Sequence, residues 1–151
     1  MIHILSDVKT KNIGGGTNIW QYVVVLENAI IGKNCNINCH CFIENDVILG
    51  DSVTIKSGVY LWDGLRIGNN VFIGPNVTFI NDKVPRSKKY PDKFLETYID
   101  DDVSIGAGSI IMGGIKIGKN SMIGAGSLVN KNVPANQLWY GSPAKYIRDI
   151  E

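Results

Sequence analysis

Amide and carboxylate side chains recur every eighteen residues in the first half of this 151-residue chain, at Asn45, Asp63 and Asn81. An amide can accept a hydrogen bond from an amine while it donates to another group, and a carboxylate can take up a proton. If residues eighteen apart lie above one another, the series predicts a polar column on one outer face of the molecule. A second interpretation stays open, in which Asn and Asp merely stack at solvated corners.

Four further side chains border this column in the sequence. Glu44 and Trp62 stand one residue before two of its members, and Asp82 and Arg86 come soon after its last member, Asn81. Trp62 would offer an apolar plate, and the charged residues could contact polar parts of a ligand. These neighbours favour the wall of a binding site over a row of solvated corners.

A second pair of segments has the same eighteen-residue spacing. The five-residue sequence Ile-Gly-Ala-Gly-Ser occurs twice, at 105–109 and at 123–127. Ala107 should therefore stack on Ala125, and Gly108 on Gly126. Small outer side chains leave room for an extended ligand to lie against the backbone. The alternative, that small residues simply fit tight corners, has equal standing.

These residues are placed by a sequence repeat with a period of six residues. Apolar side chains recur at that period from Ile13 to Phe79 and again from Ile99 to Val129. An α-helix would repeat its apolar face every three to four residues and a simple strand every second residue, so the period fits neither. It predicts short β segments joined by sharp corners and stacked into an all-β solenoid.

The fifth position of each unit is small or β-branched and should also point inward. Cys35 and Cys41 occupy this position, which indicates packing in the core. Cys39 and His40 make a metal site imaginable, but no paired C-x-x-C is present and His3 is the only other histidine. We therefore expect no metal, and a structural or surface role for His40 on a different face from the polar column.

Composition narrows the class of protein. The hydrophobic content of 44% is enough for one continuous core, and a formal charge of +1 argues against a nucleic-acid surface. No window approaches eighteen apolar residues, so we expect a soluble, cytoplasmic protein that does not enter a membrane. The chain should form a single domain with a lead-in over 1–12, coils over 13–79 and 99–133, a loop over 80–98 and a non-repeat tail over 134–151.

The loop is predicted by a break in the repeat. Phe79 and Ile99 are twenty residues apart, two more than a full coil of eighteen, so the register slips and the chain must leave the solenoid between them. A long polar loop inside a regular solenoid is usually functional or disordered.

The repeat unit, [I/L/V]-G-x-x-[small]-x, resembles that of the hexapeptide-repeat acyltransferase family. The tail, from N-V-P at 132–134 to P-A-K at 143–145, resembles the segment that closes those enzymes. The resemblance implies a left-handed parallel β-helix with three hexads per coil, and the hand comes from the resemblance alone. It also implies a homotrimer with active sites between subunits, for which outward apolar residues such as Tyr22, Phe42, Tyr60 and Phe72 are indirect support.

A closer resemblance is to N-acetyltransferases that act on nucleotide-linked 3-amino-3,6-dideoxyhexoses. The segments that carry it are Glu44-Asn45-Asp46-Val47, Leu61-Trp62-Asp63-Gly64, Phe79-Ile80-Asn81-Asp82 and Pro85-Arg86-Ser87. It implies acetyl-CoA as co-substrate and a dTDP-linked acceptor used in surface polysaccharide synthesis, such as that of lipopolysaccharide or S-layer glycan. Some sugar N-acetyltransferases carry a His-Glu pair where Asn45-Asp46 stands here, so the usual general base is missing.

The resemblance assigns roles to the two columns. Asn81 would orient the amine, while Asp63 or Asp82 could help accept a proton, unless the thiolate leaving group takes it. The residues expected to bind the acceptor are Glu44, Asn45, Trp62, Asp82 and Arg86. Those expected to bind CoA are Ala107, Gly108, Ala125, Gly126, Lys131 and Lys145, with the two lysines as phosphate partners.

Three rival functions stay open. One is acetylation of another small acceptor, and a second is a non-catalytic interaction solenoid. The third is a metal hydratase resembling carbonic anhydrases of the same fold, which need three histidines at the subunit interface. Only His3 and His40 are present here.

Overall fold

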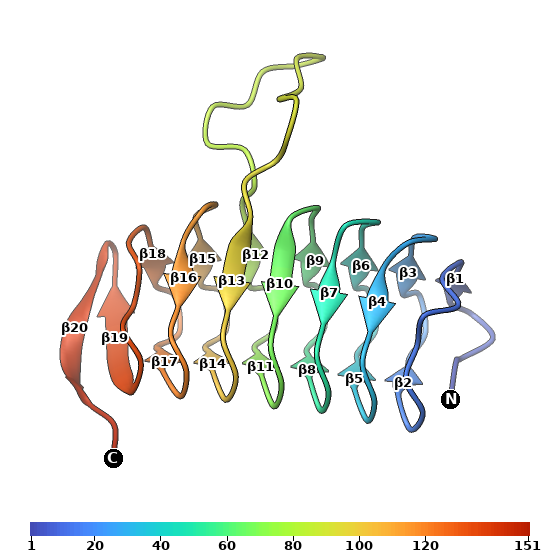
Figure 1. The fold of residues 1–151 in the computed structure, drawn as a ribbon, viewed down its shortest axis with the longest axis horizontal. Helices are drawn as coiled ribbons and strands as arrows, with labels where there is room; N and C mark the ends of the chain where they lie inside the picture. The colour runs from blue at the N-terminus through green and yellow to red at the C-terminus, as the bar shows by residue number, and fades with distance from the viewer.

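A computed structural model describes residues 1–151 as a three-sided prism of short strands, a left-handed parallel β-helix (Figure 1). Sheet A contains β2 (Asn18–Ile19), β5 (Asn36–Ile37), β8 (Thr54–Ile55), β11 (Phe72–Ile73), β14 (Ser104–Ile105), β17 (Met122–Ile123), β19 (Gln137–Gly141) and β20 (Ala144–Asp149). Sheet B contains β1 (Asp7–Val8), β3 (Val24–Val25), β6 (Phe42–Ile43), β9 (Tyr60–Leu61), β12 (Thr78–Phe79), β15 (Ile110–Ile111) and β18 (Leu128–Val129). Sheet C contains β4 (Ile30–Ile31), β7 (Ile48–Leu49), β10 (Leu65–Ile67), β13 (Thr97–Ile99) and β16 (Lys116–Ile117).

The strand register confirms the eighteen-residue coil. Ile19 pairs with Ile37 in sheet A, and Ile43 pairs with Leu61 in sheet B. Each coil therefore passes once along sheets A, B and C, and its three corners are named here A–B, B–C and C–A. All elements are strands, so no helix is present that could cross a membrane.

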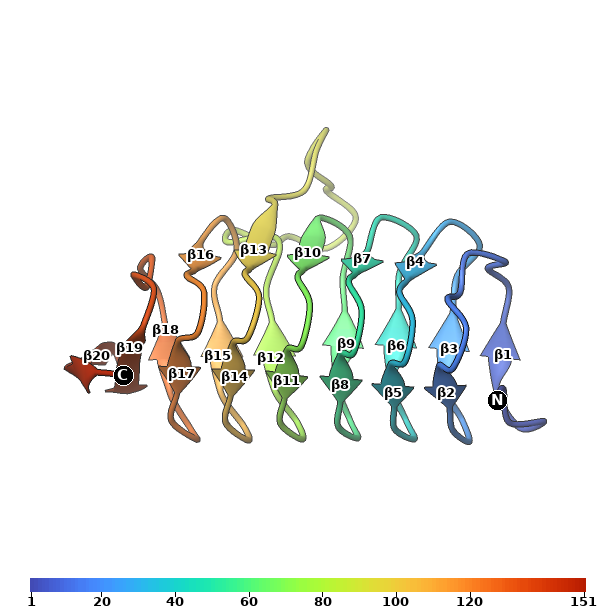
Figure 2. The same ribbon diagram turned by 60° about the horizontal axis from the view of Figure 1, so that its bottom comes forward.

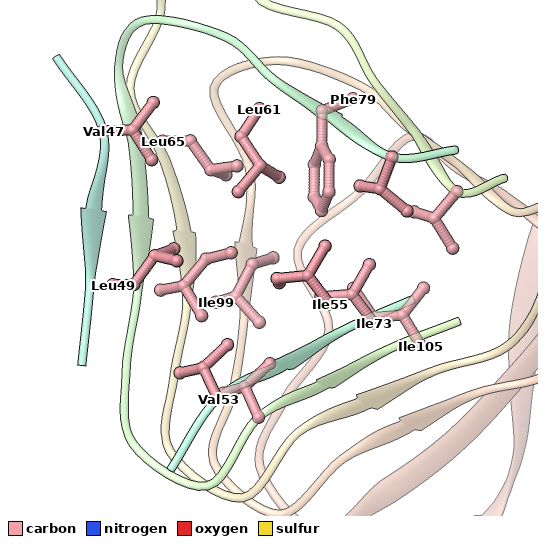
Figure 3. Packing of buried hydrophobic residues seen from close by; sticks show 14 of the residues in the cluster. Val47, Leu49, Val53, Ile55, Leu61, Leu65, Ile73, Phe79, Ile99 and Ile105 are labelled. Carbon is pink, nitrogen blue, oxygen red and sulfur yellow. The ribbon is translucent and has the colours of Figure 1, made fainter. Parts of the chain in front are cut away.

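The period-six residues form the core, as the sequence predicts. Ile55, Leu61 and Ile73 are fully buried, and the fifth-position residue Val53 packs beside them (Figure 3). Cys35 and Cys41 are also buried, which confirms the packing interpretation. Burial raises the pKa of the Cys41 thiol to about 11, so this side chain is neutral and behaves as a small apolar residue.

Both ends of the chain join the solenoid. At the N-terminus, β1 extends sheet B by pairing with β3, and Ile2 bridges to Ile19, so the lead-in forms part of the first coil. At the C-terminus, β19 runs parallel to β17 and then turns back into antiparallel β20. This hairpin covers the last edge of sheet A.

A long loop leaves the prism at the B–C corner, between β12 and β13, and projects away from it (Figures 1 and 2). Ile99 pairs with Ile67 in sheet C, so twenty residues separate Phe79 from Ile99 where one hexad would have sufficed. The insertion is thus fourteen residues in a single corner (20 − 6), rather than two residues beyond a full coil. Later coils remain in register, because Phe79 pairs with Ile111.

The base of the loop is fixed to the coils on either side. The Leu95 N–H donates to the Asn81 carbonyl at 3.2 Å, and the Thr97 N–H donates to the Gly64 carbonyl at 3.0 Å. Gly64 has a φ of +92°, and a methyl group there would lie 2.5 Å from the Leu95 carbonyl oxygen. Only glycine therefore allows the returning chain to approach this closely.

Candidate active site

The polar column lies at the B–C corner, directly below the loop. Asn81 Nδ2 donates to the Asp63 carbonyl at 3.0 Å, and the Asp46 N–H donates to Asp63 Oδ1 at 2.7 Å. In the coil below, the Asn28 N–H donates to Asn45 Oδ1 at 3.2 Å. The column therefore exists as predicted, and some of its side-chain hydrogen-bonding groups join adjacent coils.

Asn81 is held in a defined orientation at the top of the column. Its Nδ2 is occupied by the Asp63 carbonyl, whereas its Oδ1 accepts no hydrogen bond from within the chain. The next coil places Gly113 over it, because a methyl group at Gly113 would lie 3.2 Å from the Asn81 Cα. Glycine is required there for close packing of the two coils, because the same methyl group would lie 2.5 Å from the Ile80 carbonyl oxygen.

Glu44 is a half-buried carboxylate beside the column. Its Oε2 accepts a hydrogen bond from the Asp63 N–H at 2.7 Å. Burial raises the pKa of Glu44, and the hydrogen bond from the Asp63 backbone opposes that rise in pKa. A carboxylate with a raised pKa is a better proton acceptor than an ordinary one, a property that sequence reasoning did not assign to this residue.

The raised pKa of Glu44 predicts a pH-dependent contribution to stability. The native state binds this proton more tightly than the unfolded chain, so the contribution is complete below the unfolded pKa, about 4.3. It is lost as the pH rises through the native pKa. Glu44→Gln keeps an acceptor for the Asp63 N–H and cannot ionise, so the variant should gain stability relative to the parent as the pH rises from 4 to 7.

Urea unfolding at several pH values tests this expectation. Glu27→Gln is the matched control, because Glu27 is exposed in an earlier coil of the same corner. Identical pH profiles for the parent and Glu44→Gln would show that the carboxyl titrates normally.

Aromatic side chains cover the outer face of sheet B next to the column. The Trp62 ring lies 5.7 Å from the Phe42 ring and 5.9 Å from the Tyr60 ring, and Tyr22 stacks on His40 at 5.1 Å. They line a shallow hollow of about 410 Å³, which adjoins a second hollow of about 250 Å³ through Tyr60 and Trp62. Trp62 thus lies in this aromatic patch beside Asp63, and its contact with a ligand stays a prediction. His40 lies across sheet B, at the A–B corner.

The small-residue column lies at the A–B corner of the last coils, where all four residues are exposed. A methyl group at Gly108 or Gly126 would meet no atom within 4 Å. Both glycines have positive φ, but so does Asn76 at the equivalent position one coil earlier. Backbone conformation alone therefore does not demand glycine there, and the missing side chains leave an open surface.

The two lysines expected beside this column occupy different corners. Lys145 stands opposite Tyr140 in the C-terminal hairpin, and Tyr140 packs over Gly124 next to the A–B corner. Lys131 follows β18 and lies at the B–C corner, in line with Asn81 and Gly113. Within one chain, Lys131 is therefore on the opposite edge of sheet B from the small residues.

The loop residues lie farther from the column. Asp82 Oδ1 accepts a hydrogen bond from the Val84 N–H at 2.9 Å and begins the loop. The Arg86 carbonyl accepts from the Lys89 N–H at 3.1 Å, which places Arg86 in a turn of the projecting segment. Arg86 Nη1 donates to the Pro85 carbonyl at 2.9 Å, and no carboxylate pairs with its guanidinium.

Sequence reasoning missed the residues that fix the corner from outside the columns. Leu95 packs over Gly113 and Gly114 at the loop base, and Arg66 and Glu96 form ion pairs there. Gly113 could have been found, because it falls in line with Asn81 once fourteen inserted residues are subtracted. Arg66 and Glu96 carry no periodic signal.

The fold, the columns and the repeat motif together define a hexapeptide-repeat acyltransferase. The model of the bacterial transferase hexapeptide family matches residues 46–81 and 96–131, and the hexapeptide repeat of succinyl-transferase matches residues 28–62. The chain belongs to the hexapeptide-repeat transferases.

One relative is similar along almost the whole chain. It is a dTDP-3-amino-3,6-dideoxy-alpha-D-galactopyranose 3-N-acetyltransferase of Aneurinibacillus thermoaerophilus, 53% identical over 95% of this chain and 75% of its own length. A putative acetyltransferase of Bacillus cereus has a similar structure, with a TM-score of 0.70 and 27% identity over 99% of this chain and 77% of that one. A hexapeptide-repeat acetyltransferase of Vibrio cholerae, solved with acetyl coenzyme A, has a TM-score of 0.65 and 29% identity over 82% and 68%.

Proposed function

We propose that the protein transfers the acetyl group of acetyl-CoA to the amine of a nucleotide-linked, dTDP-type 3-amino-3,6-dideoxyhexose destined for a surface polysaccharide. The observation that carries the proposal is the orientation of Asn81, whose Nδ2 is bound to Asp63 while its Oδ1 remains available to an amine. The 53% identity to an enzyme named for this type of acceptor supports the substrate class. Both substrates are metabolites of the cytoplasm, where we place the protein.

The proposed reaction needs positioning more than a strong base. The neutral amine attacks the thioester carbonyl carbon, the C–S bond breaks, and an amide and CoA are formed. Asn81 Oδ1 accepts one N–H of the amine and directs its lone pair toward the carbonyl. The proton released from nitrogen passes to the thiolate or to a neighbouring carboxylate, for which Asp63 and the half-buried Glu44 are the candidates.

The two columns would form one site only between subunits. In one chain they occupy opposite edges of sheet B, at the B–C and A–B corners. A ring of identical prisms brings the A–B corner of one copy against the B–C corner of the next when sheet B faces the symmetry axis. Three copies complete such a ring in the family that this chain resembles.

Two features of the chain support this arrangement. Copies related by rotation about one axis are not shifted along that axis, so each coil of one copy lies level with the same coil of the next. Asn81 directly follows β12. Gly108 precedes β15, which pairs with β12 in the neighbouring coil. The amine site and the small-residue column would therefore meet at nearly the same height. Lys131 of each copy would then face the neighbour's Gly126, as a phosphate partner in CoA binding requires.

An inward-facing sheet B predicts which substitution breaks the trimer. Tyr60 is half exposed in the aromatic patch of sheet B, so Tyr60→Glu should introduce charge repulsion at the axis and yield monomers. Phe72→Glu is the matched control, because Phe72 is an exposed aromatic residue on sheet A. Sedimentation equilibrium measures both, and dissociation by Phe72→Glu but not by Tyr60→Glu would place the interface on sheet A instead.

The proposed function is tested by thiol release from acetyl-CoA with a panel of acceptors. The panel contains dTDP-linked 3-amino-3,6-dideoxyhexoses of both C4 configurations, a 4-amino analogue, free amino sugars, simple amines and serine. We expect the 3-amino nucleotide sugars to give the highest kcat/KM and a product heavier by one acetyl group. Preference for a simple amine or serine would overturn the acceptor class, and no binding of acetyl-CoA by calorimetry would overturn the enzyme assignment.

A further inference from the structure

Arg66 on the outer face of sheet C is the most constrained cation of the chain. Its side chain is 21% exposed, although it lies on the outside of the prism. Nη1 donates to the Asp46 carbonyl at 2.7 Å, and Nη2 donates to Asp46 Oδ1 at 2.7 Å. A two-point, charge-assisted contact of this kind fixes geometry as well as adding energy.

Asp46 connects Arg66 to the polar column through hydrogen bonds. Its carbonyl and carboxylate hold the guanidinium, while its own N–H donates to Asp63 Oδ1 at 2.7 Å. The Asp63 carbonyl in turn accepts the hydrogen bond from Asn81 Nδ2. A continuous chain of hydrogen bonds therefore runs from Arg66 to the amide proposed to orient the amine.

The same guanidinium reaches the base of the loop. Arg66 Nη2 lies 4.0 Å from Glu96 Oε1, one residue beyond the Leu95 side chain that covers Gly113. Glu96 also accepts from the Tyr98 hydroxyl at 2.5 Å and pairs with Lys93 at 3.2 Å. The loop thus returns to the prism at a cluster in which Arg66 is the only cation supplied by the prism itself.

We propose that Arg66 is a positioning residue that sets the orientation of Asp63 and Asn81 and orders the return of loop 80–98 over the acceptor site. This inference rests on the proposed function. An ion pair on an open surface contributes little to stability, so the expected effect is on geometry and loop order. The Asp46 carbonyl also accepts the Gly64 N–H at 2.9 Å, so loss of the guanidinium leaves the Asp46 peptide with one donor and leaves its carboxylate without a cation. We expect the column to loosen at this point and Glu96 to lose its only ion pair with the prism.

The test compares Arg66→Gln and Arg66→Lys with a control on the same face. Lys116→Ala is the control, because Lys116 pairs with Asp100 at 3.2 Å in sheet C and its side chain makes no hydrogen bond or ion pair with the column or with Glu96. Arg66→Gln should lower kcat/KM for the amino sugar about 10- to 100-fold, the usual cost of a small misplacement, with KM for acetyl-CoA within about twofold. Arg66→Lys should recover part of the loss, and Lys116→Ala should match the parent.

Limited trypsin digestion gives a readout independent of activity. The loop offers cleavage after Lys83, Arg86, Lys88, Lys89 and Lys93. Arg66→Gln should be cut in this segment several-fold faster than the parent at an equal melting temperature, because the loop base opens more often. If Arg66→Gln does not fold, Asp46→Asn replaces it, since it removes the charged partner and leaves the backbone in place.

Each outcome has a definite meaning. Equal increases in KM for both substrates, or digestion at the parental rate with a parental kcat/KM, would overturn the positioning role. If the parent acetylates none of the acceptors, the proposed function fails, while faster digestion of Arg66→Gln would still support the link between Arg66 and the loop.

Discussion

Asn81→Ala is expected to lower turnover by about 100- to 1,000-fold, the range seen when one preorganised hydrogen-bonding group is removed from a site. The KM for acetyl-CoA should stay within about twofold, because Asn81 is proposed to contact the amine of the acceptor and is not among the residues proposed to bind CoA. The amide is needed only where the amine must be turned toward the carbonyl. Steady-state thiol release with each substrate varied in turn measures both quantities.

The matched control for this substitution is Asn69→Ala. Asn69 Oδ1 accepts a hydrogen bond from the Asp51 N–H at 2.7 Å, so it also joins two coils, but at the C–A corner. Both variants should lose a little stability, and only Asn81→Ala should lose turnover. Equal losses of turnover and CoA affinity in Asn81→Ala would show that Asn81 acts on the fold or on the CoA side.

The sequence was sufficient to predict the prism because every coil repeats the same physical requirement. Each hexad supplies two inward side chains and one corner, so the period alone assigns Leu61 and Val53 to the core. The polar column followed from the same arithmetic, since stacking at eighteen fixes which residues share a corner. Periodicity therefore predicts all features that recur from coil to coil.

Structural features that occur only once in the chain could not be predicted from the periodicity. The fourteen-residue insertion lies wholly within the B–C corner, whereas the spacing of Phe79 and Ile99 suggested a slip of two residues. Arg66 contacts Asp46 and Glu96, which are twenty and thirty residues away, and neither separation matches the eighteen-residue coil. Side-chain pairing at such a position depends on rotamers and local exposure, which a repeat pattern does not encode.

For Lys131, the sequence predicts the corner on which the residue lies but not the residues that lie near it. Its position after β18 follows from the hexad count, and this position is the B–C corner. Sequence proximity to Gly126 suggested that the two act together, yet a whole side of the prism separates them in one chain. They can act together only across a subunit interface, so the proposed trimer is what joins this pair.

Gly108→Asn is expected to block the CoA side while the fold is kept. Gly108 has a φ of +67°, and Asn76 has 57° at the equivalent position one coil earlier, so asparagine is compatible with the backbone. The residue 108 N–H would still donate to the Pro75 carbonyl, as it does in the parent at 2.9 Å. The new side chain would fill the open surface on which the pantetheine arm is proposed to lie.

The KM for acetyl-CoA should therefore rise about tenfold or more, equivalent to roughly 1.4 kcal/mol of lost binding, and Gly126→Asn should act in the same direction. KM for the amino sugar serves as the internal control and should change little. Calorimetric titration with CoA separates binding from turnover. Unchanged CoA affinity in both variants would mean that small residues at this corner serve only the turn, because nothing else in the chain occupies the space above them.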